Sequence, residues 1–328
     1  MRVGIDIMTI GGLRLSPAGM IDYAADHGFD GMQYGGVRSL SPTLDAGELR
    51  EVKAYGDRRG MYTQVSVTSV NPVTYAGGLD ALAERIGEEV SAAAGAGWHE
   101  LHSVLNAGTE RYTHKVPWEA HVGGCVSLIN RLRPVLERHG SRINIETHGE
   151  TTFDILGIIS RTGPHLVGVC LDTANTLVNA EDPVMAARRV APYTHLTHTK
   201  DAIVAFCETG IVRQGKPVGG GDVDFRSILP ILAEYSPDLP LSIEDHKWLF
   251  TADIFDPDWM ERNPDLTALE LGRFVGLAWA TQRRLFAGEL PSIEDYEARP
   301  FMEEMEGRLL SGRDYLRGLL AELGLASE

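Results

Sequence analysis

The sequence is poor in cysteine and has no long hydrophobic run. Its three cysteines, Cys125, Cys170 and Cys207, are scattered without a CxxC pair. This count argues against a disulfide framework and for a reducing compartment. No stretch approaches the roughly 18 consecutive apolar residues of a membrane helix, and the first residues show no secretory pattern. These absences predict a cytoplasmic protein without a membrane partner.

Basic residues are also few, and this limits the kinds of partner. The 328 residues include 30 Lys and Arg against 46 Asp and Glu, so the formal net charge is 30 − 46 = −16. Such a field repels nucleic acid and anionic membrane surfaces. It fits a protein that acts on a small substrate, either neutral or bound to a metal ion.

Short apolar runs alternate with longer amphipathic ones along the whole chain. We count eight strand–helix pairs, from a first strand over residues 3–10 to an eighth strand over 240–244 and a helix within 265–288. Strands that alternate with helices favour parallel pairing, and eight such units in roughly 250 residues or more are typical of a closed (β/α)8 barrel. An open doubly wound sheet is the competing fold, but no GxGxxG follows the first strand.

We therefore predict an α/β fold, a TIM barrel over residues 1–290 with a C-terminal helical extension over residues 291–328. Residues 201–224, which include "GKPVGGGDVDF", are expected to form a long loop after the seventh strand. Long loops in compact domains are usually functional. We expect a homo-oligomer, or a complex with a partner subunit that binds through the C-terminal extension.

The ends of the expected strands five to eight carry most of the candidate functional residues. The donors are Glu146 and His148, Asp172 and Asn175, His198 with Lys200 and Asp201, and Glu244. Barrel enzymes place catalytic groups at these ends. The intervals 172 − 146 = 26 and 198 − 172 = 26 each correspond to one strand–helix unit, so we expect Glu146, Asp172 and His198 to be neighbours on the rim.

One imidazole and three carboxylates form a plausible set of ligands for one divalent metal ion. The predicted ligands are Glu146, Asp172, His198 and Glu244. This mixture favours Mn²⁺ or Mg²⁺, with Co²⁺ or Zn²⁺ as alternatives, because it lacks the thiolates of a structural zinc site. Each acid alone could instead cap a helix or face solvent. The hypothesis depends on their occurrence together on successive strand ends.

Four other residues have open interpretations. His195 lies three positions before His198 and is expected to pack or to support the site, while His102 either lines the cavity or packs in the core. Lys200 is predicted to bind substrate oxygens, with a surface ion pair to Asp201 as the alternative. Asp201 is predicted to serve substrate binding and loop order, and not to bind metal.

The ordered motifs "IETH", "CLDTAN", "HTKD", "GGGDVDF" and "SIED" resemble the xylose isomerase-like TIM-barrel superfamily, in its sugar phosphate isomerase/epimerase group. The resemblance implies that Glu146, Asp172, His198 and Glu244 bind one divalent ion. We expect this ion to be Mn²⁺, with Mg²⁺ or Co²⁺ as alternatives. It also implies that the two glutamates act as acid and base in ketose 3-epimerases. These epimerases tend to carry histidine three residues after the strand-six aspartate, and here the residue is Asn175.

His148 lies two residues after Glu146 and is expected to face the same cavity. Since a divalent ion polarises a carbonyl group, a neutral imidazole there could remove the proton on the adjacent carbon. The predicted function is a metal-dependent isomerase or epimerase of a small carbohydrate, with His148, Glu146 and Glu244 as catalytic residues and Lys200, Asn175, His102 and Asp201 as substrate-binding residues. The alternative is a lyase, either a dehydratase or an enzyme that eliminates from a 3-oxo-glycoside, with His148 as base.

Two other classes fit less well. The endonuclease IV branch of the superfamily binds DNA with several zinc ions, which the charge of −16 and the lack of extra histidine ligands oppose. A non-catalytic binding or assembly protein would have no need for four metal-competent residues in this order.

Overall fold

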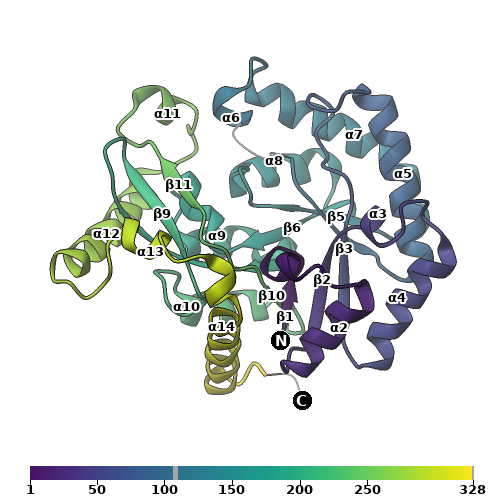
Figure 1. Cartoon of the computed structure of the whole chain (residues 1–328). Coiled ribbons are helices and arrows are strands. Elements are labelled where there is room, and N and C mark those ends of the chain that lie inside the picture. The colour runs from purple at the N-terminus through teal and green to yellow at the C-terminus, as the bar shows by residue number, and fades with distance from the viewer. Residues whose placement is uncertain (106–109, 327–328) are drawn as a thin grey trace.

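A closed barrel of eight parallel strands forms the centre of the molecule (Figure 1). The structure is a computed structural model that describes residues 1–105 and 110–326. The predicted α/β fold, a TIM barrel with helices around it, is confirmed. The barrel strands are, in spatial order, β1 (Arg2–Asp6), β2 (Gly31–Gly36), β3 (Tyr62–Ser66), β4 (Glu100–Ser103), β5 (Arg142–Glu146), β6 (Val167–Asp172), β7 (Thr194–Thr199) and β10 (Pro240–Ile243).

Most helices surround the barrel, and they start where local capping favours them. The α2 helix, for example, begins with Pro17 after Ser16, whose side chain accepts a hydrogen bond from Gly19 N. The helices in the first half are α1 (Ile7–Ile10), α2 (Pro17–Asp26), α3 (Val37–Leu40), α4 (Ala46–Arg58), α5 (Gly78–Ala96), α6 (Glu110–Thr113) and α7 (Trp118–His139). Those in the second half are α8 (Thr152–Thr162), α9 (Pro183–Val190), α10 (Phe225–Ala233), α11 (Pro257–Glu261), α12 (Ala268–Phe286), α13 (Ile293–Glu297) and α14 (Phe301–Leu323). Three short 3-10 turns cover Gly11–Leu13 (η1), Asn175–Asn179 (η2) and Ala191–Tyr193 (η3).

The first strand is shorter than the sequence predicted. It was expected to cover residues 3–10, but β1 ends at Asp6 and residues 7–10 form the α1 turn. The Asp6 side chain accepts a hydrogen bond from Met8 N and caps this turn. Asp6 therefore lies at a strand end, on the side of the barrel where active sites lie.

The prediction of a long loop over residues 201–224 is wrong for its first two thirds. Strands β8 (Asp201–Phe206) and β9 (Ile211–Lys216) pair as an antiparallel hairpin, and β11 (Leu249–Ala252) pairs with β9 to complete a second sheet. Strands β8 and β9 can pair although they are close in the sequence, because a hairpin needs only a short turn between its two strands. The second sheet extends from the barrel beside the ends of β7 and β10.

The remaining loop, residues 217–224, is ordered by one carboxylate. Asp201 accepts hydrogen bonds from the backbone N–H groups of Gly219, Gly221, Val223 and Ala202. A Cβ atom on Gly221 would lie 2.2 Å from Asp201 Oδ1, and Gly219 has a φ of +87°. The glycine-rich motif therefore has a structural explanation, because the backbone must approach Asp201 closely.

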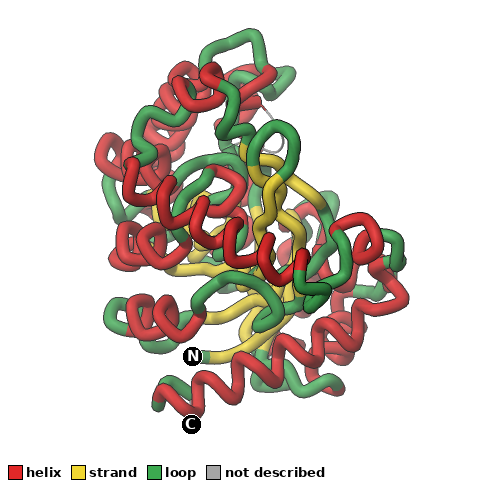
Figure 2. Tube along the Cα trace, turned by 90° about the vertical axis from the view of Figure 1, so that its left-hand side faces the viewer, coloured by secondary structure: helices red, strands yellow, loops and turns green. Residues whose placement is uncertain are grey.

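The expected C-terminal helical region is present as α12–α14, apart from residues 327–328, which lie outside the described part of the chain. The helix expected to follow the eighth barrel strand forms as α12, but it packs on β8 of the second sheet. It is α14 that lies against β1 and β10. Figure 2 shows this long helix beside the N-terminal strand, and Met1 N donates to Leu325 O at 2.7 Å. The division of the chain at residue 290 stays a prediction.

No helix within residues 1–105 or 110–326 combines the length and the apolar character that crossing a membrane requires.

A buried ion pair attaches α14 to the end of β10. Arg308 donates to both carboxylate oxygens of Asp245, at 2.7 and 2.5 Å, and both side chains are buried. Asp245 directly follows Glu244, one of the predicted metal ligands. The C-terminal helix therefore fixes the backbone that carries this ligand.

Replacing Arg308 by methionine should lower the free energy of unfolding by about 3–5 kcal/mol, because it leaves Asp245 buried without its counter-charge. Urea denaturation followed by circular dichroism measures this loss. The control is Arg317→Met on the same helix, since the pair that Arg317 makes with Asp30 is largely exposed and should contribute less than about 1 kcal/mol. Equally small losses in the two variants would contradict the anchoring role of Arg308.

Candidate functional site

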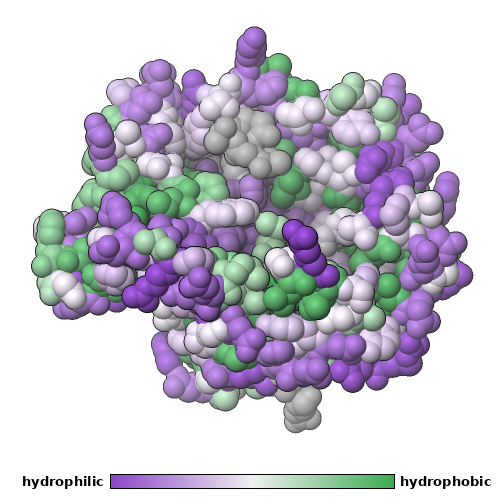
Figure 3. Space-filling model, in the orientation of Figure 1, coloured by the Kyte–Doolittle hydropathy of each residue, from purple (hydrophilic) through white to green (hydrophobic). Residues whose placement is uncertain are grey.

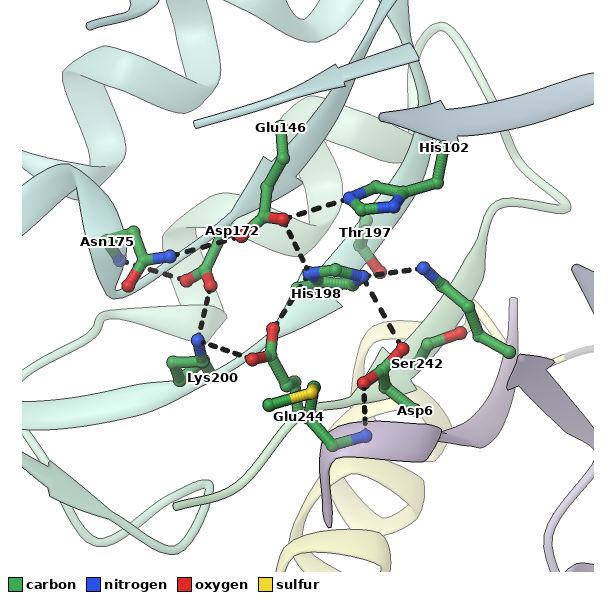
Figure 4. A network of polar contacts seen from close by, with 12 residues as sticks. Asp6, His102, Glu146, Asp172, Asn175, Thr197, His198, Lys200, Ser242 and Glu244 are labelled. Carbon is green, nitrogen blue, oxygen red and sulfur yellow. Dashed lines mark hydrogen bonds and ion pairs between the residues drawn. The ribbon is translucent and has the colours of Figure 1, made fainter. Parts of the chain in front are cut away.

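Five neighbouring barrel strands bring polar side chains together at the C-terminal mouth of the barrel (Figure 4). His102, Glu146, Asp172 and His198 come from β4, β5, β6 and β7, and Glu244 directly follows β10. Asp172 is the register partner of His198 between β6 and β7. Parallel register places these groups at one height, so residues far apart in the sequence become neighbours.

The four predicted metal ligands form one buried cluster. One ligand atom from each of Glu146, Asp172, His198 and Glu244 lies within 4.8 Å of the others. His198 Nδ1 is 2.8 Å from Glu244 Oε2 and 3.3 Å from Glu146 Oε2. The structure thus brings together all four residues that the 26-residue spacing and the strand ends selected.

This cluster fits a divalent metal ion. Asp172 Oδ2, His198 Nδ1 and Glu244 Oε2 are buried and lack a hydrogen bond of good geometry within the described residues. Their near neighbours are charged groups, Lys200 Nζ at 2.7 Å from Asp172 Oδ2 and His198 Nδ1 at 2.8 Å from Glu244 Oε2. Buried polar atoms are normally satisfied, and an ion among three carboxylates and an imidazole would satisfy these. Such hard donors suit Mn²⁺ or Mg²⁺.

A second group, His102, Cys170 and His198, also lies close enough to hold an ion and shares His198 with the first. Burial raises the pKa of the Cys170 thiol to about 11. The thiol is therefore protonated near neutral pH and is a poor ligand. The carboxylate cluster is the better metal site.

The other face of His198 is held by two residues that the sequence analysis did not select. Gln33 Nε2 lies 2.6 Å from His198 Nε2, and Asp6 Oδ2 lies 3.7 Å from the same ring nitrogen. The ring orientation leaves Nδ1 directed at the carboxylates. A metal ion on Nδ1 requires the proton on Nε2, and the Gln33 amide accepts it when its carbonyl oxygen, which otherwise has no partner within the described residues, is turned toward the ring. Burial raises the pKa of Asp6 to about 7, although His198 opposes this shift.

Of the two residues, only Asp6 could have been found from the sequence, with a better boundary for the first strand. Asp6 was missed because the first strand was expected to continue to residue 10. Gln33 is an uncharged residue in the middle of β2 and gives no sequence signal, although it is completely buried.

Two buried cations offset the negative charge of the cluster. Lys200 Nζ lies 2.7 Å from Asp172 Oδ2 and 3.0 Å from Glu244 Oε1. Burial by itself would lower the pKa of Lys200, but Asp172 and Glu244 raise it above its ordinary value. Arg213, on β9, is almost completely buried, and its charge also acts on Asp172 and Glu244. Its position was hidden from sequence reasoning because residues 201–224 were expected to form a loop.

The residues around the cluster set the charge state of Glu146. Burial would raise its pKa, but His198 and His102 hold it well below its usual range. His102 Nε2 lies 2.9 Å from Glu146 Oε2, while Asn175 Nδ2 donates to Glu146 Oε1 at 3.2 Å. Glu146 is therefore an anion, and each of its two carboxylate oxygens has a hydrogen-bond partner. His102 lines the cavity, which decides between its two interpretations.

A cavity of about 210 Å³ opens above the cluster. The predicted residues that line it are His102, Glu146, His148, Asn175, His198, Lys200 and Glu244. The remaining wall includes Tyr34, His246, Trp248 and Phe250. His246 and Trp248 lie between β10 and β11, and Phe250 lies in β11. Aromatic walls around a few convergent polar groups are typical of a small-molecule site.

The structure places the other candidates as follows. His148 is partly exposed in the turn after β5, on the cavity wall. His246 also faces the cavity, and burial together with Lys200 lowers its pKa to about 4, so it is neutral near pH 7. The Asp201 carboxylate accepts hydrogen bonds from three backbone N–H groups of the 217–224 loop and from that of Ala202, which supports the predicted role in loop order. Its predicted role in substrate binding stays a prediction. His195 contacts Arg142, at the opposite end of β7 from Lys200, and is not part of the site.

Comparison with known proteins agrees with this architecture. The family model described as xylose isomerase-like TIM barrel matches residues 21–256. A search of curated proteins found no match.

Several solved structures share the fold. D-psicose 3-epimerase from Clostridium cellulolyticum H10 is 16% identical with a TM-score of 0.63, covering 86% of this chain and 98% of that one. The probable 3-DHS dehydratase AsbF from Bacillus anthracis is 15% identical with a TM-score of 0.57, covering 82% of this chain and 100% of that one. The 3-keto-D-glucoside 4-epimerase from E. coli is 15% identical with a TM-score of 0.55, covering 84% and 99%. At these identities the likeness shows the fold alone.

Proposed function

The chain belongs to the xylose isomerase-like TIM-barrel family, and on this basis we propose that it isomerises or epimerises a small keto-sugar with the help of one divalent metal ion. The observation that carries the proposal is the buried cluster of Glu146, Asp172, His198 and Glu244 at the base of the cavity. Held by these residues, the ion, for which Mn²⁺ is our first choice, would polarise a carbonyl group of the substrate. The fold neighbours that are named as sugar epimerases support this reaction class.

The chain's own residues supply the proton transfers. His148 lies on the cavity wall, where its neutral imidazole would take the proton from the carbon next to the carbonyl. Lys200 would stabilise the negative charge that then develops on oxygen. Addition of a proton from water to the opposite face of that carbon would give an epimer. Addition to the former carbonyl carbon, with transfer of the adjacent hydroxyl proton to the former carbonyl oxygen, would give an isomer.

A lyase is the second candidate, and one observation favours it. Ketose 3-epimerases tend to have a histidine where this chain has Asn175, and an amide cannot give or take a proton as an imidazole can. Here the Asn175 side chain donates a hydrogen bond to Glu146. With His148 as the single base, loss of a β-leaving group would replace reprotonation. One fold neighbour is named as a probable dehydratase.

Metal binding can be measured directly. Isothermal titration with Mn²⁺ after chelation should show one ion per chain, and Glu146→Gln or Glu244→Gln should weaken binding by more than about 100-fold, beyond the usual effect of an outer partner. Glu100→Gln is the matched control, because Glu100 begins β4 at the opposite end of the barrel. If the wild type binds no ion, or if all three variants bind equally well, the proposed cluster is not a metal site.

Lys200→Met separates a role toward substrate from a role in ordering the ligands. Removing a cation 2.7 Å from Asp172 and 3.0 Å from Glu244 should leave Mn²⁺ affinity unchanged or higher, since the carboxylates then face less competing positive charge. Turnover should fall by about 10²–10³-fold, the scale of one stabilising donor. Loss of metal with turnover would instead assign Lys200 to the organisation of the ligands.

The base can be identified by solvent exchange. Ketohexoses such as D-tagatose and, separately, a 3-oxo-glucoside are incubated with the Mn²⁺-loaded protein in D₂O, and deuterium at the carbon next to the carbonyl is followed by NMR. His148→Ala should keep its metal and lose about 10²–10⁴-fold in exchange rate. The control is His246→Ala, which removes another imidazole from the cavity wall, one whose low pKa makes it a weak base.

The products then distinguish the two candidates. An epimer or isomer supports the first, and loss of the leaving group supports the lyase. Exchange at the wild-type rate in His148→Ala would mean that a carboxylate such as Glu146 or Glu244 is the base. Absence of both exchange and product with every compound would contradict the proposed function.

A further inference from the structure

One long helix has an apolar face that nothing in the described chain covers. The buried side of α12 packs on β8, while the opposite side exposes Leu269, Trp279 and Phe286, at 63%, 53% and 76% of their surfaces. Figure 2 views the molecule from the left of Figure 1, and α12 runs across its front. Hydrophobic surface is visible at that left edge in Figure 3. More than half of each of these three large apolar side chains is exposed, along the length of the helix.

The spacing of this face is that of a helix–helix contact. The positions are Leu269, Gly272, Gly276, Trp279, Arg283 and Phe286, at intervals of three, four, three, four and three. Residues spaced alternately three and four positions apart lie along one side of a helix. They form a seam along which a second helix can pack. The buried face of the same helix is separate, so the exposed seam is not needed to hold α12 on β8.

Two glycines in the middle of the seam leave open space beside the helix. A Cβ atom on Gly272 or Gly276 would have no heavy atom within 4 Å among the described residues. Glycine inside an exposed helix costs about 1 kcal/mol relative to alanine. Small residues at a helix seam allow a second helix to approach closely and leave room for a large side chain opposite.

Charges at the two ends indicate what the second helix is. Asp265 lies just before α12 and Arg283 lies near its end; both are exposed, and neither makes an ion pair within the described residues. An antiparallel copy of the same helix would place the acidic end of one beside the basic end of the other. A parallel arrangement would bring like charges together.

We propose that α12 mediates a two-fold symmetric dimer of this chain, in which two copies of the helix pack antiparallel and cross near Gly276. With the axis between Val275 and Gly276, Trp279 of each copy faces Gly272 of the other, so a bulky side chain fills the space that the glycine leaves. Arg283 then lies within about one helical turn of Asp265 of the second copy. The contact is self-complementary, as a two-fold interface requires. This inference does not depend on the proposed reaction.

Sedimentation velocity over a wide range of concentration tests the dimer with the purified full chain alone. The wild type should sediment as a dimer, and Trp279→Glu should raise the dissociation constant by about 30-fold or more, the scale of an interface hot spot. Tyr235→Glu is the control, because Tyr235 is equally exposed, at 53%, but lies outside α12. Circular dichroism should show the same helix content in all three proteins.

Cross-linking tests the arrangement. In a Cys207→Ser background, which leaves only the buried Cys125 and Cys170, Gly276→Cys should form a disulfide-linked dimer on oxidation, since a residue beside the axis lies close to its own copy. Gly307→Cys, on the exposed side of α14 with open space around it, should remain monomeric on a denaturing gel. A wild type that is monomeric at every concentration, or a dimer that Trp279→Glu leaves intact, would overturn the proposal. A dimer that Gly276→Cys fails to link would overturn the antiparallel arrangement.

Discussion

The concentration of negative charge at the mouth of the barrel is the constraint on which the site depends. Glu146, Asp172 and Glu244 converge on one imidazole, that of His198, in a place with little water. Buried carboxylates so close together are costly unless cations accompany them. Burial by itself would lower the pKa of His198, but the negative charges of Glu146 and Glu244 hold it well above its ordinary value. The charge of the carboxylates can therefore be neutralised in two alternative ways. Either the His198 imidazole carries a proton, or a metal ion binds among the carboxylates.

The surrounding structure supports this charge balance. Lys200 extends from the end of β7 to two of the carboxylates, and Arg213 adds a buried positive charge from the hairpin that interrupts the barrel. On the far side, Gln33 fixes the orientation of the His198 ring. The C-terminal helix α14 reaches the same region through Arg308, which binds the residue after Glu244. The barrel, the second sheet and the C-terminal helices thus all contribute to one cluster.

The sequence predicted the barrel and the four clustered residues because both follow from a repeat. Each strand–helix unit returns the chain to the same end of the sheet, so Glu146, Asp172 and His198 could be aligned by counting. Gln33 could not be found in this way, since its role depends on a side-chain contact across the barrel. The hairpin that carries Arg213 was missed because its strands pair outside the repeat. The helix expected to follow the eighth barrel strand, α12, packs on β8, and α14 lies against β1 and β10 instead. This choice depends on tertiary packing, which the periodicity of apolar residues does not specify.

The central claim is that one divalent ion binds among these four side chains. A crystal structure of the protein grown with Mn²⁺, with anomalous data collected at the manganese edge, tests it most directly. The account predicts a single anomalous peak per chain, in contact with Glu146, Asp172, Glu244 and His198 Nδ1, while His198 Nε2 remains on Gln33. The absence of a peak at saturating Mn²⁺, or a peak between His102 and Cys170 instead, would contradict it.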